Sequence, residues 1–321
     1  MTSEKFETRG NVHHQAYHMP LSYAISDTFS DDLREPHRYK IALITSGSGI
    51  LTLANERRAF IAPSILCLSE TSAMRVEKAA SVALHLVYFH PTVINRTLTF
   101  ASMRTEYRDI YSPEAMDYSS LRPFRHQHHA GWLHNLGLVE AQRLQEIFNA
   151  LARQLETQPD GYWPCRSRTY LIELLFALAQ LYLNETHEQE IGPQCVKFEL
   201  PTPPEQPEIY PVLVHLLNNY HKRITIPELS KTFHTNRNSL SQKFKKATGT
   251  TVVDYLSKVR VRVACQLLKD SSLPIVEISE RTGYVDVTHF GRTFRKYTSL
   301  SPSEYRDRYQ GEVSLRPHQE N

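Results

Sequence analysis

Cysteine is scarce in this 321-residue chain, and the cysteines present show no pairing pattern. Cys67, Cys165, Cys195 and Cys265 lie far apart and form no Cys-x-x-Cys motif, which indicates free thiols in a reducing compartment. Long apolar runs are missing too: no stretch of about 18 apolar residues occurs, and the polar N-terminus lacks the apolar segment of a signal peptide. The sequence therefore predicts a cytoplasmic protein without a membrane-embedded part.

The motifs of common catalytic sites are absent as well. The chain has no glycine-rich phosphate loop, no Gly-x-Ser-x-Gly elbow and no His-Glu-x-x-His helix. The densest histidine group consists of His126, His128, His129 and His134. This group has no cysteine or carboxylate at ligand spacing, so a solvated loop is favoured over a zinc site. We therefore expect no enzymatic activity, no bound metal and no cofactor.

Positive charge, in contrast, is concentrated near the C-terminus. Residues 211–310 hold 17 lysines and arginines against 8 aspartates and glutamates, whereas the remaining residues hold 20 against 26. The two parts therefore carry net charges of +9 and −6. Such asymmetry indicates a nucleic-acid partner for the basic part.

Within the basic part, residues 274–306 predict two short helices joined by a tight turn. Pro274 suits the first turn of a helix, Gly283 suits the left-handed position that ends it, and Asp286 can cap the next helix. One face of that next helix is apolar, with Val287, Phe290, Phe294 and Tyr297, and the opposite face carries Thr288, Gly291, Arg292 and Arg295. The pattern favours a helix-turn-helix whose second helix enters the major groove, although such pairs also occur as plain packing motifs.

The motif occurs a second time, at an offset of 50 residues. Leu240 and Phe244 correspond to Phe290 and Phe294, and five further pairs match: Lys245, Lys246, Thr248, Asp254 and Tyr255 with Arg295, Lys296, Thr298, Glu304 and Tyr305. In this copy Asn236 can cap the recognition helix, whose outer side consists of Arg237, Asn238, Ser241, Gln242 and Lys245. We expect the DNA contacts to come from these five residues together with Thr288, Gly291, Arg292 and Arg295.

A predicted helix over residues 252–269 joins the two copies. It spans about 27 Å, which with the flanking turns can hold the recognition helices about one DNA turn, roughly 34 Å, apart. One chain can thus read two adjacent major grooves. Lys258, Arg260 and Arg262 on this helix either reach phosphates or are plain solvated charges, and the pattern does not decide between the two.

The spacing of residues in this region resembles the AraC/XylS family of bacterial transcription regulators. The resemblance covers residues 210–308, about a third of the chain, and is carried by Leu229, Ser230, Leu240, Phe244, Lys245, Gly249, Tyr255, Arg260, Ala264, Leu267, Leu268, Ile275, Ile278, Gly283, Tyr284, Phe290, Arg292, Phe294, Lys296, Pro302, Tyr305 and Arg306. The sequence departs from the family at Gln242, where arginine is frequent, and at Ser299, where glycine is usual, so that either a strained or a differently capped helix end is expected there. The resemblance implies a homodimer that binds double-stranded DNA at a promoter or operator, and it allows RNA polymerase as a further partner.

The N-terminal half shows short strands instead. Between about Leu21 and Asn95, β-branched and aromatic runs alternate with turn signals at Ser46–Gly49 and Asn55–Glu56, which predicts an all-β sandwich or barrel. By resemblance to the family, residues 1–135 form a cupin-like barrel that binds a small polar or sugar-like effector. The strands lack the His-x-His pair and spaced glutamate of a cupin metal site. Candidates for hydrogen bonds to the effector are His37, Tyr39, His85 and Tyr88, although each is explained equally well as an ordinary strand residue.

After Leu136 the apolar period becomes that of helices. Residues 136–155 and 169–183 each predict a helix, and the second is apolar almost all round. Residues 136–185 are our candidate dimerisation segment, with burial inside the same chain as an equally supported alternative. A proline-rich linker over 186–208 then leads to the DNA-binding domain at 209–308, which is followed by a tail at 309–321.

Together these features predict an α+β protein of two domains: an N-terminal cupin-like β-barrel with trailing helices, and a C-terminal all-α domain with two helix-turn-helix motifs. The predicted function is a sequence-specific DNA-binding transcription regulator controlled by a small-molecule effector. Two alternatives stay open, a cupin-type metalloenzyme fused to a DNA-binding domain and a DNA-binding protein whose barrel takes no ligand. The sequence names neither the effector, nor the target promoter, nor the direction of regulation.

Overall fold

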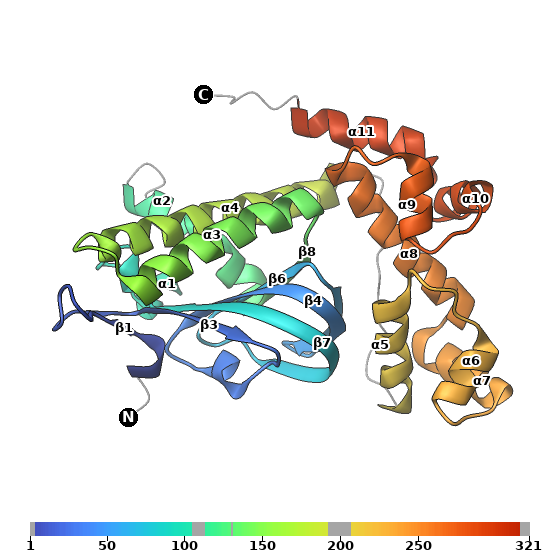
Figure 1. Cartoon of the computed structure of the whole chain (residues 1–321), viewed down its shortest axis with the longest axis horizontal. Helices are drawn as coiled ribbons and strands as arrows, with labels where there is room; N and C mark the ends of the chain where they lie inside the picture. The colour runs from blue at the N-terminus through green and yellow to red at the C-terminus, as the bar shows by residue number, and fades with distance from the viewer. Residues whose placement is uncertain (1–3, 105–112, 130, 192–206, 315–321) are drawn as a thin grey trace.

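The computed structural model describes residues 4–104, 113–129, 131–191 and 207–314. Its N-terminal part combines a β-sheet with two long helices, and its C-terminal part consists of helices (Figure 1). This mixed architecture with a helical C-terminal domain confirms the coarse fold prediction.

The main sheet has six antiparallel strands in the order β3-β7-β4-β6-β8, with β5 paired to the second half of β4. The strands are β3 (Leu21–Ser26), β4 (Tyr39–Leu53), β5 (Glu56–Ile61), β6 (Ser64–Leu68), β7 (Met74–Phe89) and β8 (Trp132–Asn135), and a separate pair consists of β1 (Thr8–Arg9) and β2 (His18–Met19). The path of the main sheet has two ends, β3 and β8. The strands that the structure describes therefore form an open sheet, and the predicted closed barrel is not confirmed.

The predicted turn at Ser46–Gly49 is wrong, because β4 runs straight through it. Ser48 pairs with β7, and the register shifts beside it mark bulges rather than a chain reversal. Gly47 has φ +87°, and a Cβ there would lie 2.5 Å from a carbonyl oxygen of β7, so this glycine serves the bulge. The other predicted turn is confirmed, but it lies one residue earlier, at Ala54 and Asn55. Both residues have positive φ, 43° and 71°, as in the tight turns that join two antiparallel strands.

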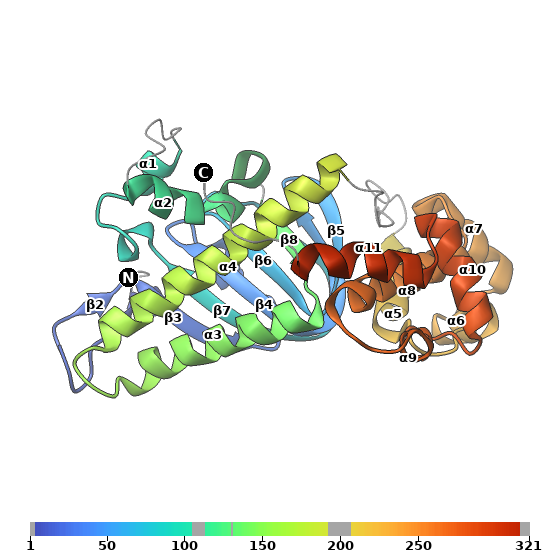
Figure 2. The ribbon, with the colours of Figure 1, turned by 90° about the horizontal axis from the view of Figure 1, so that it is seen from above.

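Apolar side chains cover both faces of the sheet. On one face, Ile41, Leu43 and Val87 pack with residues of α3 (Leu138–Thr157) and α4 (Trp163–Ile191). Figure 2 shows these two helices lying across the strands. On the other face, a second core is completed by side chains of η1 (Glu4–Phe6) and η2 (Asp31–Arg34). The connection from β7 to β8 contributes η3 (Pro91–Val93), α1 (Phe100–Met103), α2 (Pro113–Ser120) and η4 (Arg122–His129).

Both helices predicted after the sheet are confirmed, and α4 is longer than expected. It ends at Ile191, inside the predicted linker, of which residues 192–206 lie outside the described residues. Leu171, Leu174 and Leu178 are fully buried within the chain, whereas Phe176 is 48% exposed. Packing within the chain therefore accounts for the apolar residues on the buried side of α4. Dimerisation through this helix stays a prediction. Among the described residues, no helix is both long enough and apolar enough to cross a membrane.

The C-terminal domain consists of two similar halves joined by one helix. After η5 (Pro207–Ile209) and α5 (Tyr210–Asn219), the first half contains α6 (Ile226–Thr232) and α7 (Arg237–Thr248), and the second contains α9 (Ile275–Arg281) and α10 (Val287–Thr298). The long α8 (Val252–Asp270) connects the halves, and α11 (Pro302–Ser314) follows them. The repeat seen in the sequence is thus a repeat of structure.

Local capping residues begin these helices where the sequence predicts. Thr225 and Glu228 form a reciprocal capping box before α6. Ser301 and Glu304 form another before α11, with bonds of 2.6 and 3.3 Å. Each pair satisfies backbone N–H groups that a helix start otherwise leaves without partners. Gly283 follows α9 with φ +86°, the left-handed conformation expected at that position.

Candidate nucleic-acid interface

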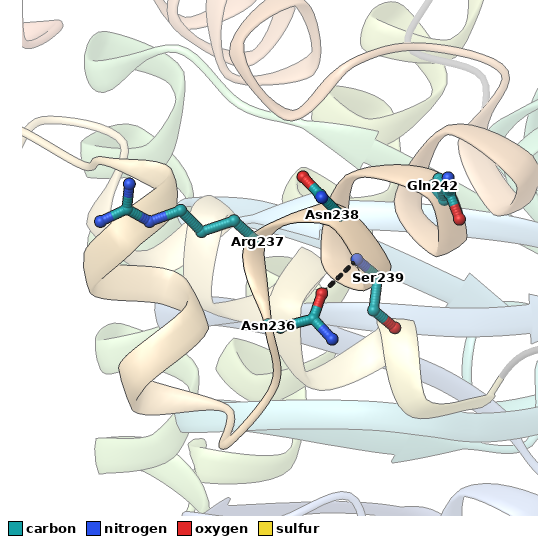
Figure 3. A pocket seen from close by; sticks show the side chains of 5 residues that line it. All are labelled: Asn236, Arg237, Asn238, Ser239 and Gln242. Carbon is teal, nitrogen blue, oxygen red and sulfur yellow. Dashed lines mark hydrogen bonds between the residues drawn. The ribbon is translucent and has the colours of Figure 1, made fainter.

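The first recognition helix, α7, presents a polar face at its N-terminal end. Asn236 accepts a hydrogen bond from the backbone N–H of Ser239 at 2.7 Å and so caps the helix. Because Leu240 and Phe244 are buried, the opposite side faces outward. On that side Arg237, Asn238, Gln242 and Lys245 are exposed, and Ser241 is half-buried. Three of these residues, Arg237, Asn238 and Gln242, line a shallow depression at the start of α7 (Figure 3).

The second recognition helix, α10, is organised in the same way. Asp286 accepts hydrogen bonds from the backbone N–H groups of Thr288 at 2.9 Å and His289 at 3.1 Å, and these bonds hold the pKa of its carboxyl below the usual range. Phe290 and Phe294 are buried, which leaves Thr288, Arg292 and Arg295 exposed and Gly291 half-buried. A Cβ added to Gly291 would have no atom within 4 Å, so the outer face of α10 is open at this residue.

The basic candidates on both outer faces differ from other basic residues nearby. Elsewhere in the domain, ion pairs join Lys243 to Glu208, Arg281 to Glu277 and Lys296 to Asp254. Within the ranges that the structure describes, no ion pair involves Arg237, Lys245, Arg292 or Arg295. These four side chains therefore present their charge to solvent, as phosphate or guanine contacts require.

Two apolar residues at the start of α10 were not predicted as site residues, and the expectation that Val287 belongs to the buried face of this helix is wrong. Val285 is fully exposed at the turn before the capping Asp286, and Val287 is 40% exposed in the first helical turn. The first copy has Thr235 where the second has Val285. An exposed valine beside a recognition helix can contact the methyl group of thymine. A comparison of the two copies in the sequence could have revealed this residue, because Val285 is apolar where Thr235 is polar.

Arg260 makes structural contacts within the protein. Its Nε and Nη2 donate to the backbone carbonyls of Tyr220 and Lys222, each at 2.8 Å. Its guanidinium also lies over the ring of Tyr284, 5.2 Å from the centroid. The expectation of a plain solvated charge is therefore wrong for Arg260, and a phosphate contact stays a prediction.

Both recognition helices lie on the side of the C-terminal domain that faces away from the sheet (Figures 1 and 2). The opposite side of the domain is docked on the N-terminal part. Ile50 and Ala59 of the sheet belong to the same apolar cluster as Leu213 and Leu217 of α5. The Arg57 guanidinium lies 5.6 Å from the ring centroid of Tyr210, at the start of α5. The two parts thus share a core that leaves α7 and α10 uncovered.

A second contact between the two parts lies at the end of α8. The side chain of Gln266 donates to the backbone carbonyl of Asn135 at 2.8 Å, just before α3 begins. Close by, Gly137 caps α3 beside the carboxylate of Asp270, and a Cβ on Gly137 would lie 1.7 Å from Asp270 Oδ2. A larger residue at position 137 would therefore require the Asp270 side chain to move.

The four candidates for effector contacts lie at different places in the N-terminal part. His37 is exposed before β4, whereas Tyr39 is fully buried and stacks on Phe124 at 4.8 Å between ring centroids. His85 Nδ1 is 2.5 Å from the Tyr23 hydroxyl, and burial lowers the pKa of this imidazole. Tyr88 belongs to the core on the opposite face of the sheet. The four do not line one cavity, and their role in ligand binding stays a prediction.

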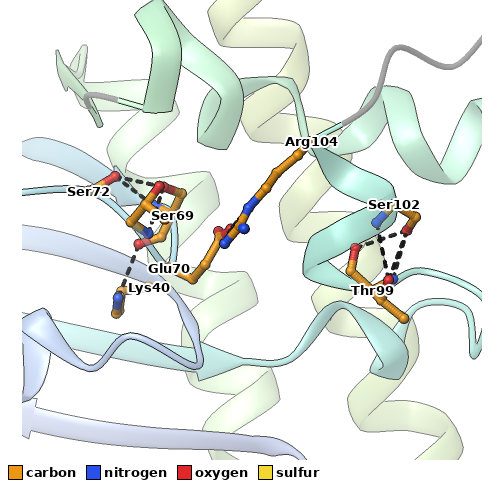
Figure 4. A network of polar contacts seen from close by, with 8 residues as sticks. Lys40, Ser69, Glu70, Ser72, Thr99, Ser102 and Arg104 are labelled. Atoms are coloured by element: carbon orange, nitrogen blue, oxygen red, sulfur yellow. Dashed lines mark hydrogen bonds and ion pairs between the residues drawn. The ribbon is translucent and has the colours of Figure 1, made fainter.

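A polar network around Glu70 was not predicted (Figure 4). Glu70 Oε1 accepts a hydrogen bond from Arg104 at 3.3 Å, but Glu70 Oε2 and the Tyr39 hydroxyl are buried without hydrogen-bond partners. Lys40 Nζ donates to the backbone carbonyl of Ser69 at 3.1 Å, and burial lowers the pKa of Lys40 to about 8. Buried polar atoms without partners are unusual, because each carries a desolvation cost.

Of the histidine group seen in the sequence, the structure describes the side chain of His134 alone. His134 lies on β8, where its Nδ1 is 3.0 Å from Glu185 Oε2, and the same oxygen accepts a bond from the Trp132 indole at 2.7 Å. The side chains of His126, His128 and His129 lie outside the described residues. Within the described part, no three histidine, cysteine, aspartate or glutamate side chains converge as a metal site.

Comparison with known proteins places the similarity on the C-terminal domain. Residues 229–308 match the family model of a helix-turn-helix domain. The chain is 34% identical to the lactose operon transcription activator of Staphylococcus xylosus over 115 residues, which are 32% of this chain and 41% of that protein. It is 31% identical to the RCS-specific HTH-type transcriptional activator RclR of Escherichia coli K12 over 102 residues, 32% of this chain and 36% of the other.

The matches thus span less than half the length of either curated relative. Among solved structures, an AraC-type transcriptional regulator from Chromobacterium violaceum is 26% identical, with a TM-score of 0.31, covering 32% of this chain and 93% of that one. The residues matched by the family model contain α7, α8 and α10. The similarity therefore includes both recognition helices and the helix between them.

Proposed function

Because residues 229–308 form an AraC-type helix-turn-helix domain, we propose that this chain is a transcription regulator that binds double-stranded DNA sequence-specifically and responds to a small polar effector. It acts in the cytoplasm as a homodimer at a promoter or operator, and RNA polymerase is a further partner. The effector binds the N-terminal part, and the DNA is read by α7 and α10.

The arrangement of the two recognition helices is the observation that carries this proposal. Each begins with a side-chain cap, buries two large apolar residues and exposes a polar and basic outer face. Both lie away from the surface where the domain docks on the sheet (Figure 2). Two such faces on helices that both pack against α8 suit two successive segments of major groove.

The outer faces suggest different base preferences in the two grooves. The Arg292 guanidinium fork can bind O6 and N7 of one guanine together, and Gly291 beside it lets the DNA approach α10 closely. Gln242 occupies the equivalent position of α7, and its amide is suited to N6 and N7 of adenine. Arg237, Lys245 and Arg295 contact phosphates, while Asn238, Ser241 and Thr288 supply further polar contacts.

Effector control is supported by two features of the N-terminal part. The partnerless Tyr39 hydroxyl and Glu70 Oε2 are a donor and an acceptor that a polar ligand can satisfy. The contacts of the sheet with α5, and of Asn135 with Gln266, provide a route from that region to the DNA-binding domain. A ligand that binds one docked arrangement more tightly than another then changes the affinity of the protein for DNA. By linkage, DNA changes the affinity for the ligand by the same factor.

A ligand screen on the full chain tests effector control. DNA is first selected from a random pool, and small polar compounds are then screened by thermal shift and by their effect on affinity for the selected DNA. A compound at a hundred times its Kd should stabilise the protein by about 2.7 kcal/mol and change DNA affinity. Tyr39→Phe should lose this response, while Tyr162→Phe, at a tyrosine that is 70% exposed just before α4, should keep it.

The outcomes separate the three candidate functions. Ligand binding that persists in a chelator and changes DNA affinity supports the proposal. Ligand binding that a chelator abolishes favours a metalloenzyme fused to a DNA-binding domain. If no compound in a broad polar set shifts unfolding while DNA binding is intact, the protein is a ligand-independent DNA binder.

A further inference from the structure

The two halves of the DNA-binding domain have separate apolar cores. The first contains Leu240, Phe244 and Val259, the second contains Val261, Phe290 and Phe294, and no residue belongs to both. The helix α8 passes from one core to the other between Val259 and Val261. Bodies with separate cores and few contacts between them move relative to each other by default. Direct contacts between the halves therefore determine the separation and the relative rotation of α7 and α10.

The first such contact is made by Arg260, at the point where α8 changes cores. Its two bonds of 2.8 Å reach Tyr220 and Lys222 in the first half, and its guanidinium lies over Tyr284 of the second half. A Cβ on Gly283 would lie 2.6 Å from the Tyr220 carbonyl oxygen, so the turn before α10 touches the end of α5 directly. Arg260 thus joins both halves through one side chain.

The second contact reaches the recognition helix itself. Asp254, in the first turn of α8, accepts a hydrogen bond from the Tyr297 hydroxyl at 2.5 Å and one from Lys296 Nζ at 3.0 Å. These bonds, with that from Tyr297 the larger influence, hold the pKa of Asp254 below its usual range. Copy one of the repeat has Ala247 where copy two has Tyr297. The tyrosine is therefore not a requirement of the motif, and it serves the contact between halves.

We propose that Arg260 and Tyr297 are positioning residues that hold α7 and α10 at one separation and one rotation, so that the protein accepts a single spacing between the two base sequences it reads. This inference rests on the proposed function. Each added base pair moves a half-site by about 3.4 Å and turns it by about 35° around the DNA axis. A rigid pair of recognition helices matches one spacing, whereas a loosened pair also accepts the neighbouring ones.

The test measures spacing preference with the full chain. The bipartite site of the wild type is determined by selection from random DNA, and a second pool then varies only the number of base pairs between its two parts. Arg260→Lys replaces the two separate donors Nε and Nη2 and the planar group over Tyr284 by a single ammonium nitrogen, and Tyr297→Phe removes only the hydroxyl. Both variants should accept spacings one base pair shorter and longer, and should lose about tenfold in affinity at the original spacing as preorganisation is lost.

Matched controls and unfolding separate positioning from general damage. Arg281→Lys changes an exposed arginine whose ion pair is with Glu277 in the same helix, and Tyr162→Phe changes a tyrosine that is 70% exposed. Both should keep the sharp wild-type spacing. If Arg260→Lys and Tyr297→Phe lower thermal stability and affinity at all spacings alike but keep one sharp spacing, the inference is wrong. A wild type that selects no bipartite site contradicts the proposed function itself.

Discussion

At the scale of single residues, the two copies of the repeat differ at the end of the recognition helix. Ser299 ends α10 with φ 64°, where the equivalent Gly249 ends α7 with φ 70°. The left-handed conformation costs a residue with a side chain roughly 1–2 kcal/mol, and glycine avoids this cost. Of the two helix ends expected at Ser299, strained or differently capped, the structure therefore has the strained one, in the same left-handed conformation as Gly249.

Exchanging the residues at these two positions should change stability in opposite directions. Ser299→Gly should raise the free energy of unfolding by about 1 kcal/mol, and Gly249→Ser should lower it by about the same amount, since no atom lies within 4 Å of a Cβ there. Urea unfolding of the full chain, followed in the transition of the DNA-binding domain, measures both changes. Equal stability of Ser299→Gly and wild type would show that the serine is held without strain.

At the scale of elements, the sequence predicted helices better than strands, because helix starts depend on neighbouring residues. Asn236 and Asp286 cap α7 and α10 through bonds to residues two or three positions along the chain. The Ser46–Gly49 segment carries an equally strong local turn signal, but pairing with β7 turns it into bulges of a continuous strand. Long-range contacts of this kind leave no local signal in a single sequence.

The same reasoning applies to the candidate site. Periodicity predicted the outward faces of α7 and α10, because buried Phe244 and Phe294 fix which side faces solvent. Periodicity did not reveal that Arg260 faces inward, since its partners Tyr220 and Lys222 are about 40 residues away along the chain. It also gave no information on the interior network around Tyr39 and Glu70.

The open face of α10 gives a prediction in which stability and binding change in opposite directions. Gly291→Ala should stabilise the helix by about 1 kcal/mol, because alanine has a higher helix propensity and its methyl group meets no protein atom. The same methyl group should obstruct the DNA and weaken binding. Thermal unfolding and DNA titration measure the two effects, with the exposed Ser303→Ala on α11 as a control that should leave DNA affinity unchanged. Unchanged affinity of Gly291→Ala would mean that α10 does not approach DNA at this residue.

At the scale of the whole molecule, the docking of the two parts is the feature that the sequence did not predict. The proline-rich composition of residues 186–208 suggested independent domains. In the structure, however, α5 belongs to an apolar cluster that includes Ile50 and Ala59 of the sheet, and α8 contacts the start of α3. Because this docking leaves both recognition helices uncovered, the proposed effector control predicts a change in the position of these helices and not their covering.

The central claim, that α7 and α10 read bases, is tested most directly by selecting preferred sites from random DNA with the wild type, Arg292→Ala and Gln242→Ala. Arg292→Ala should lose about 1–3 kcal/mol and relax the preference at one guanine, and Gln242→Ala should do the same, more weakly, at an adenine of the other half-site. Arg281→Ala, on the neighbouring α9, should keep the wild-type preference at every position. If Arg292→Ala also keeps that preference and loses affinity uniformly for all sequences, Arg292 contacts a phosphate and the assignment of α10 as a base-reading helix is contradicted.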